Sequence, residues 1–294
     1  METNTRLSHI LCLSCPASAD YSSFFEKLLV DAYHRSKDGC GEEKKEGNMP
    51  YHFDTFVCNN DTLRISTSTR STFNQKVNQA TTIIVTGSSS SAYDDDLWIK
   101  CLSKTIVEAN NRGVQLLGIC FGHQIIAQSL GGKVIKNPNG VENGVCTYVV
   151  TDYAMDYLSA LSKCSGRLPS NKLSLYCWHG DVVSILPPKD FVPGGFNENT
   201  QHQMYYNKSN VLCFQSHPEF NSEWLMSLAK KYYFTKDIDR YHLIEASVNE
   251  LEESVLVAST FINDAIYQFC IVNGIHGIST TKRPNELKQL DNEL

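Results

Sequence analysis

VQLLGICFGHQIIAQSLGG, residues 114–132, joins a strand pattern to a helix pattern around a single cysteine. An apolar run leads into Gly118, Cys120 and Gly122, and a helical pattern follows that ends at two glycines. A sharp turn between a strand and a helix lifts one side chain above a sheet, and small flanking residues keep this strained turn free of clashes. The stretch therefore predicts a strand, a nucleophile elbow at Cys120 and a helix.

Cys120 has two interpretations in this context. At a helix N-terminus, the helix dipole and the free backbone N–H groups favour a thiolate and a developing oxyanion, so Cys120 is a candidate nucleophile. A buried structural thiol is the commonest state of a cysteine. A G-x-C-x-G motif by itself does not decide between them, because a catalytic cysteine also needs a base.

The segment FQSHPEF, residues 214–220, offers that base. His217 can take a thiol proton and later protonate a leaving amine. Glu219 lies two residues further on. Because positions i and i+2 of an extended segment point the same way, its carboxylate can hold the imidazole in one tautomer. An isolated His-Pro-Glu is better interpreted as a surface turn, but beside the elbow motif the segment favours a Cys-His-Glu triad.

Outside these two segments, short apolar runs alternate with longer amphipathic stretches, which is the pattern of an α/β domain with a largely parallel sheet. Between Gly132 and Phe214 the chain is rich in β-forming and turn residues, so several further strands are expected to be antiparallel. Strands are expected at residues 9–13, 53–58, 82–86, 114–119, 133–136, 146–150, 173–178 and 211–214, helices at residues 21–34, 95–110 and 224–233, and a solvated loop at residues 36–48.

The C-terminal part of the chain predicts one long helix. Apolar residues recur every three or four positions from Tyr241 to Phe269. The stripe could be a coiled-coil seam, but further apolar residues widen it, which favours docking on the chain's own body. Residues 1–236 are therefore expected to form the main domain, residues 237–275 a helical extension packed on it, and residues 276–294 a flexible tail.

The overall composition excludes several classes of protein. The chain has 294 residues and a net charge of −6, and 41% of its residues are hydrophobic, which excludes a disordered or fibrous protein. Without a dense Lys/Arg block, we expect no binding to nucleic acid. No signal-peptide pattern occurs, and no apolar stretch is near the roughly 20 residues that span a bilayer. We therefore expect a cytoplasmic protein with no membrane partner.

No metal site and no cofactor are expected. Cys12 and Cys15 form a C-x-x-C that could serve redox chemistry or half of a zinc site, but no second cysteine pair has a matching spacing. Neither a Walker motif nor a G-x-G-x-x-G phosphate motif occurs. Most of the 11 cysteines are therefore expected to be buried thiols.

GICFGHQ, residues 118–124, and QSHPEF, residues 215–220, together resemble the signature pair of class I, triad-type glutamine amidotransferase domains. The resemblance covers roughly residues 8–235. It implies the fold of that family, which has three α/β/α layers around a mostly parallel, flavodoxin-like central sheet with additional antiparallel strands.

The same resemblance implies a reaction. In this family the triad cleaves a γ-glutamyl amide bond, which assigns that chemistry to Cys120, His217 and Glu219. Cys120 would attack the γ-carbonyl of a glutamine-like substrate and form a thioester. Ammonia or an amine would leave, and water would release glutamate.

Four substrate-binding positions also follow from the resemblance. One oxyanion donor would be the backbone N–H of Phe121. Another would come from the loop that begins at Gly87 and Ser88, where a serine run replaces the Gly-Gly-Pro-Gly-like segment of many members. Gln124 matches the family's glutamine that contacts the substrate amide.

Two nearby histidines are given no catalytic role. His179-Gly-Asp181 resembles the HGD segment of GMP-synthetase-type amidotransferase domains, and we expect it in a loop near the site. His123, between two motif residues, is expected to cap or pack behind the elbow.

The resemblance leaves three functions open. GSSSSAYDDDLWI, residues 87–99, resembles free-standing GMP-synthetase-like amidotransferase proteins, and the residues after 236 are too few for a synthetase domain. The chain would then be a glutaminase that passes ammonia to an unidentified acceptor or to a synthetase partner. Plant relatives of those proteins are γ-glutamyl peptidases acting on glutathione-derived substrates, and the triad cannot separate the two reactions. A non-catalytic regulatory subunit is the third interpretation, and the complete triad disfavours it.

Overall fold

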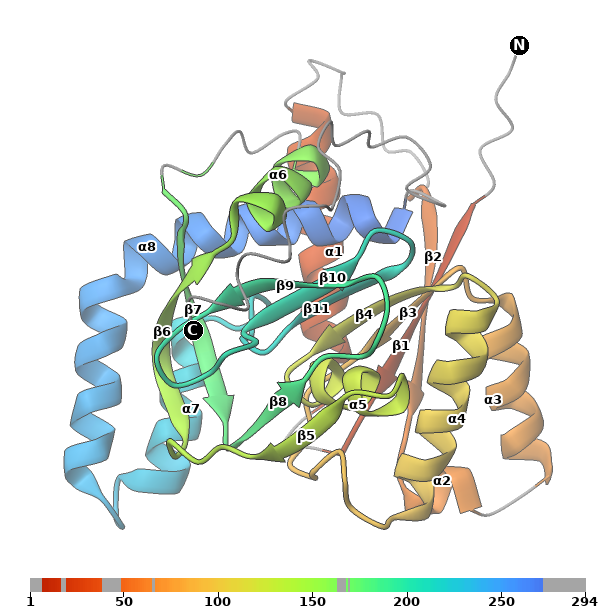
Figure 1. Ribbon diagram of the computed structural model, residues 1–294, viewed down its shortest axis with the longest axis horizontal. Coiled ribbons are helices and arrows are strands. Elements are labelled where there is room, and N and C mark those ends of the chain that lie inside the picture. Colours follow the sequence, from red (N-terminus) through yellow and green to blue (C-terminus); the bar gives the residue numbers. More distant parts are fainter. Residues whose placement is uncertain are drawn as a thin grey trace.

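One large sheet runs through the computed structural model, which describes residues 7–16, 20–38, 49–64, 67–162, 168 and 170–271 (Figure 1). Its strands are β1 Ser8–Ser14, β2 Tyr51–Val57, β3 Thr82–Val85, β4 Gln115–Ile119, β6 Glu142–Val150, β7 Lys172–His179, β9 Phe191–Phe196, β10 Met204–Asn207 and β11 Val211–Phe214. They are hydrogen-bonded in the order β2-β1-β3-β4-β11-β10-β9-β6-β7. The strands β5 Lys133–Lys136 and β8 Asp181–Ile185 form a separate antiparallel pair.

The sheet is parallel from β2 to β11 and antiparallel from β11 to β7. This confirms the predicted parallel sheet with additional antiparallel strands. The carboxyl ends of β3, β4 and β11 lie side by side, because Val85 is paired with Gly118 and Phe214 with Ile119. Ligands of open α/β sheets bind beyond these ends, and the three segments that carry the predicted site residues begin there.

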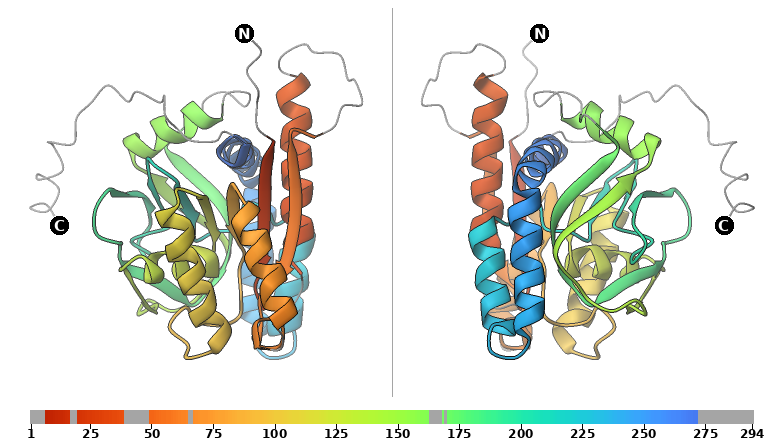
Figure 2. Two further views of the ribbon diagram at one scale, coloured as in Figure 1. Left: turned by 90° about the vertical axis from the view of Figure 1, so that its right-hand side faces the viewer. Right: turned by 90° about the vertical axis from the view of Figure 1, so that its left-hand side faces the viewer.

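Helices cover both faces of the sheet. They are α1 Ser22–Asp38, α2 Asn60–Arg64, α3 Thr67–Gln79, α4 Leu97–Asn111, α5 Phe121–Ser129, α6 Asp152–Leu161, α7 Ser222–Tyr233 and α8 Ile238–Ile271. Successive strand residues point to opposite faces of the sheet and pack into two separate hydrophobic cores. Ile10 of β1 packs with α1, α6, α7 and α8, whereas Leu11 packs with α3, α4 and α5. The predicted three-layer α/β/α architecture is therefore confirmed, and α1, α7 and α8 lie together in Figure 2.

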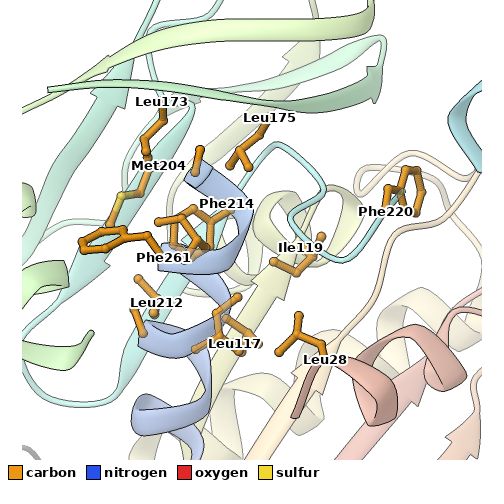
Figure 3. Close-up of a cluster of buried hydrophobic side chains, with 14 of the residues drawn as sticks. Leu28, Leu117, Ile119, Leu173, Leu175, Met204, Leu212, Phe214, Phe220 and Phe261 are labelled. Atoms are coloured by element: carbon orange, nitrogen blue, oxygen red, sulfur yellow. The ribbon is translucent and has the colours of Figure 1, made fainter. Parts of the chain in front are cut away.

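The long helix α8 packs across one face of the sheet and bends on its way (Figure 1). Phe261 of α8 packs with Leu212 and Phe214 of β11 in the hydrophobic core on this face of the sheet (Figure 3). Asn263 Nδ2 donates to the Pro218 carbonyl oxygen at 3.3 Å. Among the described helices, α8 alone is long and apolar enough to cross a membrane by length and composition, but 56% of that apolar window is buried inside the protein.

The apolar stripe of α8 is narrower than its sequence indicates. Ile244, Val248 and Ile262 are buried, but Leu256 and Val257 are 65% and 47% exposed. Opposite charges add a further contact, because Arg35 Nη2 of α1 lies 2.7 Å from Asp264 Oδ1. The face of α8 that contacts the body therefore consists of the stripe together with Phe261 and Ile266 beside it, which are also buried.

Several elements differ from the predicted ones. α1 extends to Asp38, so residues 36–38 of the expected loop are helical, while residues 39–48 and the expected tail lie outside the described residues. The helix α3 was not predicted, because its sequence TSTRSTFNQKVNQ buries only Phe73 and Val77 among its described apolar side chains. The strand β9, FVPGGF, contains a proline and two glycines that obscure a strand pattern.

Candidate active site

Cys120 stands at the turn between β4 and α5 with a backbone conformation that few side chains adopt. Its φ is 54° and its ψ is −105°, and strain of this kind in a non-glycine residue accompanies functional sites. The Cys120 backbone N–H donates to the Phe214 carbonyl oxygen at 2.9 Å, so β11 holds the turn in place. The predicted strand, sharp turn and helix are present.

Two glycines let the elbow pack against its neighbours. A Cβ on Gly122 would lie 1.9 Å from the Val85 carbonyl oxygen of β3, and a Cβ on Gly118 would lie 2.6 Å from the Gly122 carbonyl oxygen. A side chain does not fit at either position. The Gly122 N–H instead donates to the Thr86 carbonyl oxygen at 3.1 Å. The elbow is thereby held against the end of β3.

His217 and Glu219 form a buried pair in the segment that follows β11. His217 Nδ1 is 2.8 Å from Glu219 Oε1, and the two side chains are 3% and 0% exposed. The His217 backbone N–H donates to the Tyr176 carbonyl oxygen of β7 at 2.7 Å. The imidazole also stacks on Phe220, with ring centroids 4.0 Å apart. Because Nδ1 is engaged by the carboxylate, Nε2 is the ring nitrogen left for a thiol or a substrate.

Cys120, His217 and Gly87 meet at one point. A Cβ on Gly87 would lie 3.1 Å from His217 Cε1 and 3.7 Å from Cys120 Cβ. Burial alone would lower the pKa of His217, but the negative charges of Glu219 and of the Cys120 thiolate outweigh it and raise that pKa. An imidazole with a raised pKa is a stronger base for a thiol proton. The three predicted triad residues therefore lie together in an arrangement that suits proton transfer.

Replacing Glu219 by glutamine is expected to move the alkaline limb of the pH–rate profile to lower pH. The charge of Glu219 raises the pKa of His217. With a neutral amide in its place, His217 loses its proton at a lower pH, and the imidazolium that would protonate a leaving amine disappears earlier. The measurement is kcat/KM for glutamate release across neutral and alkaline pH.

The matched control for this variant is Glu223→Gln, which removes an exposed carboxylate in the first turn of α7. It should leave the limb where it is. An alkaline limb that stays in place in the Glu219 variant would contradict the electrostatic role of that carboxylate.

Phe121 and Gly87 supply backbone N–H groups beside Cys120. Among the residues that the structure describes, neither N–H donates to a backbone carbonyl, and Phe121 is the first residue of α5, where N–H groups have no acceptor within the helix. Two such donors next to a nucleophile fit an oxyanion hole. Ser88 also lines the pocket, and its hydroxyl donates to the Pro16 carbonyl oxygen at 2.5 Å, which holds the loop.

Gln124 lies one turn into α5, where its side chain joins two other segments. Its Nε2 donates to the Asp181 carbonyl oxygen at 2.8 Å and to Gln215 Oε1 at 3.2 Å. Gln124 borders the same pocket as Cys120 and His217. Because both donor hydrogens of its amide are used within the protein, a substrate contact by Gln124 would have to use its Oε1.

Asp181 connects three parts of the pocket wall. Ser91 Oγ and Tyr93 OH donate to its carboxylate at 2.6 and 3.0 Å, which fastens the loop that follows β3. Its carbonyl oxygen lies 3.2 Å from His179 Nδ1 and also accepts from Gln124. The His179-Gly-Asp181 segment thus lies at the pocket, where it joins β7 to β8.

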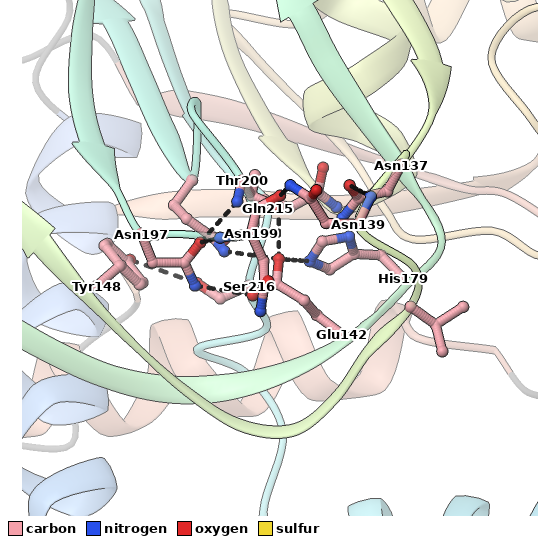
Figure 4. A network of polar contacts seen from close by, with 12 residues as sticks. Asn137, Asn139, Glu142, Tyr148, His179, Asn197, Asn199, Thr200, Gln215 and Ser216 are labelled. Atoms are coloured by element: carbon pink, nitrogen blue, oxygen red, sulfur yellow. Dashed lines mark hydrogen bonds and ion pairs between the residues drawn. The ribbon is translucent and has the colours of Figure 1, made fainter. Parts of the chain in front are cut away.

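A buried network of polar contacts around Glu142 includes His179 (Figure 4). Glu142 Oε2 is 3.3 Å from His179 Nε2. Three neutral side chains donate to the same carboxylate: Asn197, Thr200 and Gln203. Burial would raise the pKa of Glu142, but His179, Thr200 and Asn197 lower it to about 2. No motif identifies Glu142, because its contact with His179 follows from the pairing of β6 with β7.

The pocket that these segments enclose has a volume of about 420 Å³, which lies in the range of about 300–1,000 Å³ found for small-molecule sites. Among the described residues, no group of three His, Cys, Asp or Glu side chains is arranged to hold a metal ion. Cys12 and Cys15 are buried free thiols, and burial raises the pKa of each. His123 is fully buried behind the elbow, where burial lowers its pKa and keeps it neutral.

Comparisons with known proteins identify one family. The model of the family described as "Glutamine amidotransferase class-I" matches residues 48–231. The Gamma-glutamyl peptidase 4 of Arabidopsis thaliana is 30% identical over 145 residues, which are 49% of this chain and 56% of that protein. A glutamine-hydrolyzing GMP synthase of Prochlorococcus marinus (strain MIT 9515) is 29% identical over 180 residues, 59% of this chain and 31% of that protein. In both cases the match spans less than two thirds of the relative's length.

Solved structures show the same fold. The crystal structure of a glutamine amidotransferase from Thermotoga maritima aligns with a TM-score of 0.60 at 18% sequence identity, and the alignment covers 90% of this chain and 99% of that chain. At this identity, the likeness extends to the arrangement of helices and strands.

Proposed function

This chain belongs to the class-I glutamine amidotransferase family, and from that premise we propose that it hydrolyses a γ-glutamyl amide bond through a glutamyl thioester on Cys120. The observation that carries the proposal is the meeting of Cys120, on its strained elbow, with the buried pair of His217 and Glu219. The backbone N–H groups of Phe121 and Gly87, which donate to no backbone carbonyl among the described residues, lie beside Cys120.

The first half of the reaction forms the thioester. His217 Nε2 takes the Cys120 proton, and Sγ attacks the γ-carbonyl carbon of the substrate. The oxygen becomes an oxyanion, which the N–H groups of Phe121 and Gly87 stabilise. The tetrahedral intermediate then collapses, the C–N bond breaks, and His217 gives its proton to the departing nitrogen. Glu219 holds the His217 ring in place by its contact with Nδ1 and stabilises the imidazolium while it carries the extra proton.

The second half releases glutamate. A water molecule enters in place of the amine, and His217 Nε2 takes one of its protons. The resulting hydroxide adds to the thioester carbonyl, the C–S bond breaks, and the sulfur takes the proton back from His217. Glutamate leaves with the water oxygen in its new carboxylate, and the site returns to its starting state.

Glutamine is the first candidate substrate. Its leaving group is ammonia, which the chain would pass to an unidentified acceptor or to a synthetase partner. The similarity to a glutamine-hydrolyzing GMP synthase supports this assignment.

A γ-glutamyl peptide is the second candidate substrate. The similarity to an Arabidopsis γ-glutamyl peptidase supports it, and so does the size of the pocket, about 420 Å³, which leaves room beyond a glutamine side chain. Both substrates place the same γ-carbonyl on Cys120.

An assay of the purified chain with glutamine and with γ-glutamyl dipeptides tests the proposal, with glutamate release as the measurement. We expect glutamate from at least one of the two classes. Cleavage of glutamine alone would reject the peptidase assignment, and cleavage of dipeptides alone would reject the ammonia-transfer assignment. No glutamate from either class would contradict the proposed function.

A further inference from the structure

Large apolar side chains line one part of the pocket around Cys120. They are Leu228 and Tyr232 of α7, together with Val141 and Trp178. Tyr232 and Val141 are 40% and 46% exposed, so this apolar part of the pocket is open to water. An exposed apolar surface that continues a reactive site is a sign of ligand contact.

Aromatic contacts fix this wall close to the nucleophile. The Trp178 ring lies 5.7 Å from each of the rings of Tyr232 and Tyr233. Asn143 Nδ2 is 2.5 Å from the Tyr233 hydroxyl, and the Trp178 carbonyl oxygen is 3.7 Å from Cys120 Sγ. The aromatic side chains of this wall therefore contact one another, and the backbone of Trp178 lies next to the reacting sulfur.

The position of His217 indicates which part of a substrate meets this wall. His217 must lie next to the departing nitrogen, because it protonates that nitrogen. Phe220 stacks on the His217 ring, and α7 begins at Ser222, two residues later. Leu228 and Tyr232 are four residues apart and so share one face of α7. A group attached to the departing nitrogen would therefore run along this face.

We propose that Trp178, Tyr232 and Tyr233 form a subsite for the side chain of the released amine, and that the chain prefers γ-glutamyl peptides whose second residue is aromatic. Ammonia would make no contact with this apolar surface, whereas an aromatic ring of the leaving amine would stack on it and bury it. The inference rests on the proposed function, since it assigns the leaving group of the same reaction.

The test compares kcat/KM for γ-glutamylphenylalanine, γ-glutamylglycine and glutamine. The native chain is expected to favour the phenylalanine compound over the glycine compound by about tenfold or more. In Tyr232→Ala the ratio of these two values should fall by about tenfold, and in Tyr232→Phe, which keeps the ring, it should stay near the native ratio. Tyr232 is exposed, so neither change opens a core cavity.

Tyr153→Ala is the matched control. Tyr153 is 43% exposed on α6 and does not line the pocket, so its loss should leave the ratio at the native value. Equal cleavage of the phenylalanine and glycine compounds, or an unchanged ratio in Tyr232→Ala, would overturn the subsite and leave the proposed hydrolysis standing. Failure to release glutamate from all three compounds would overturn the hydrolysis and the subsite with it.

Discussion

Cys120→Ala is expected to lower glutamate release by about 10⁴-fold or more, because removal of a catalytic nucleophile leaves only the weak catalysis that the oxyanion donors provide. Alanine keeps the Cβ, so the positive φ of 54° carries the same strain in the variant as in the native chain. The fold should therefore survive. The measurement is the rate of glutamate release, accompanied by a thermal melt that shows the variant to be folded.

Cys101→Ala is the control for this experiment. Cys101 is a partly exposed free thiol on α4 and lies outside the pocket, so its loss should leave the rate near the native value. A Cys120→Ala protein that keeps a tenth or more of the native rate would show that glutamate is released by another group. The proposed thioester would then be wrong.

Gly122→Ala is expected to destabilise the fold by about 3 kcal/mol or more, at the upper end of the range for overpacking. The new Cβ would lie 1.9 Å from the Val85 carbonyl oxygen. One side of this contact is the backbone of β3 in the middle of the sheet, and the other is the buried first turn of α5, so neither side can move away cheaply. The unfolding midpoint should drop by about 6–12 °C for a domain of this size, and glutamate release should fall as the elbow is displaced.

Gly113→Ala separates close packing from backbone strain. Gly113, unlike Gly122, has a positive φ, 73°, but a Cβ there would meet nothing within 4 Å. Its replacement should cost only about 1 kcal/mol. If the Gly122 variant melted no lower than the Gly113 variant, the close approach of α5 to β3 would not be what holds the elbow.

The parts of the site that could be predicted from the sequence are those encoded by neighbouring residues. The elbow at Cys120 follows from an apolar run and two glycines, and the pair of His217 and Glu219 follows from a spacing of two in extended backbone. Only the family resemblance indicated that Cys120 would meet this pair. The two segments are far apart along the chain, and the pairing of β4 with β11 brings them together.

The parts that could not be predicted depend on contacts between distant segments. Glu142 reaches His179 because β6 and β7 pair in one register, and no spacing in the sequence signals that register. The Ser88 hydroxyl is bonded to the Pro16 carbonyl, on another loop, and no sequence pattern signals that contact. The wall formed by Trp178 and Tyr232 also joins two elements that are remote in the chain.

The contact between Asn263 and the Pro218 carbonyl limits how the chain can change in length. An insertion or deletion that slid α8 by one turn, about 5.4 Å, would carry Asn263 away from the peptide that lies between His217 and Glu219. Substitutions on the outer side of α8, where Leu256 and Val257 face water, are free of that restriction. The number of residues between Glu219 and Asn263 therefore matters more for the position of this peptide than the identity of many of them.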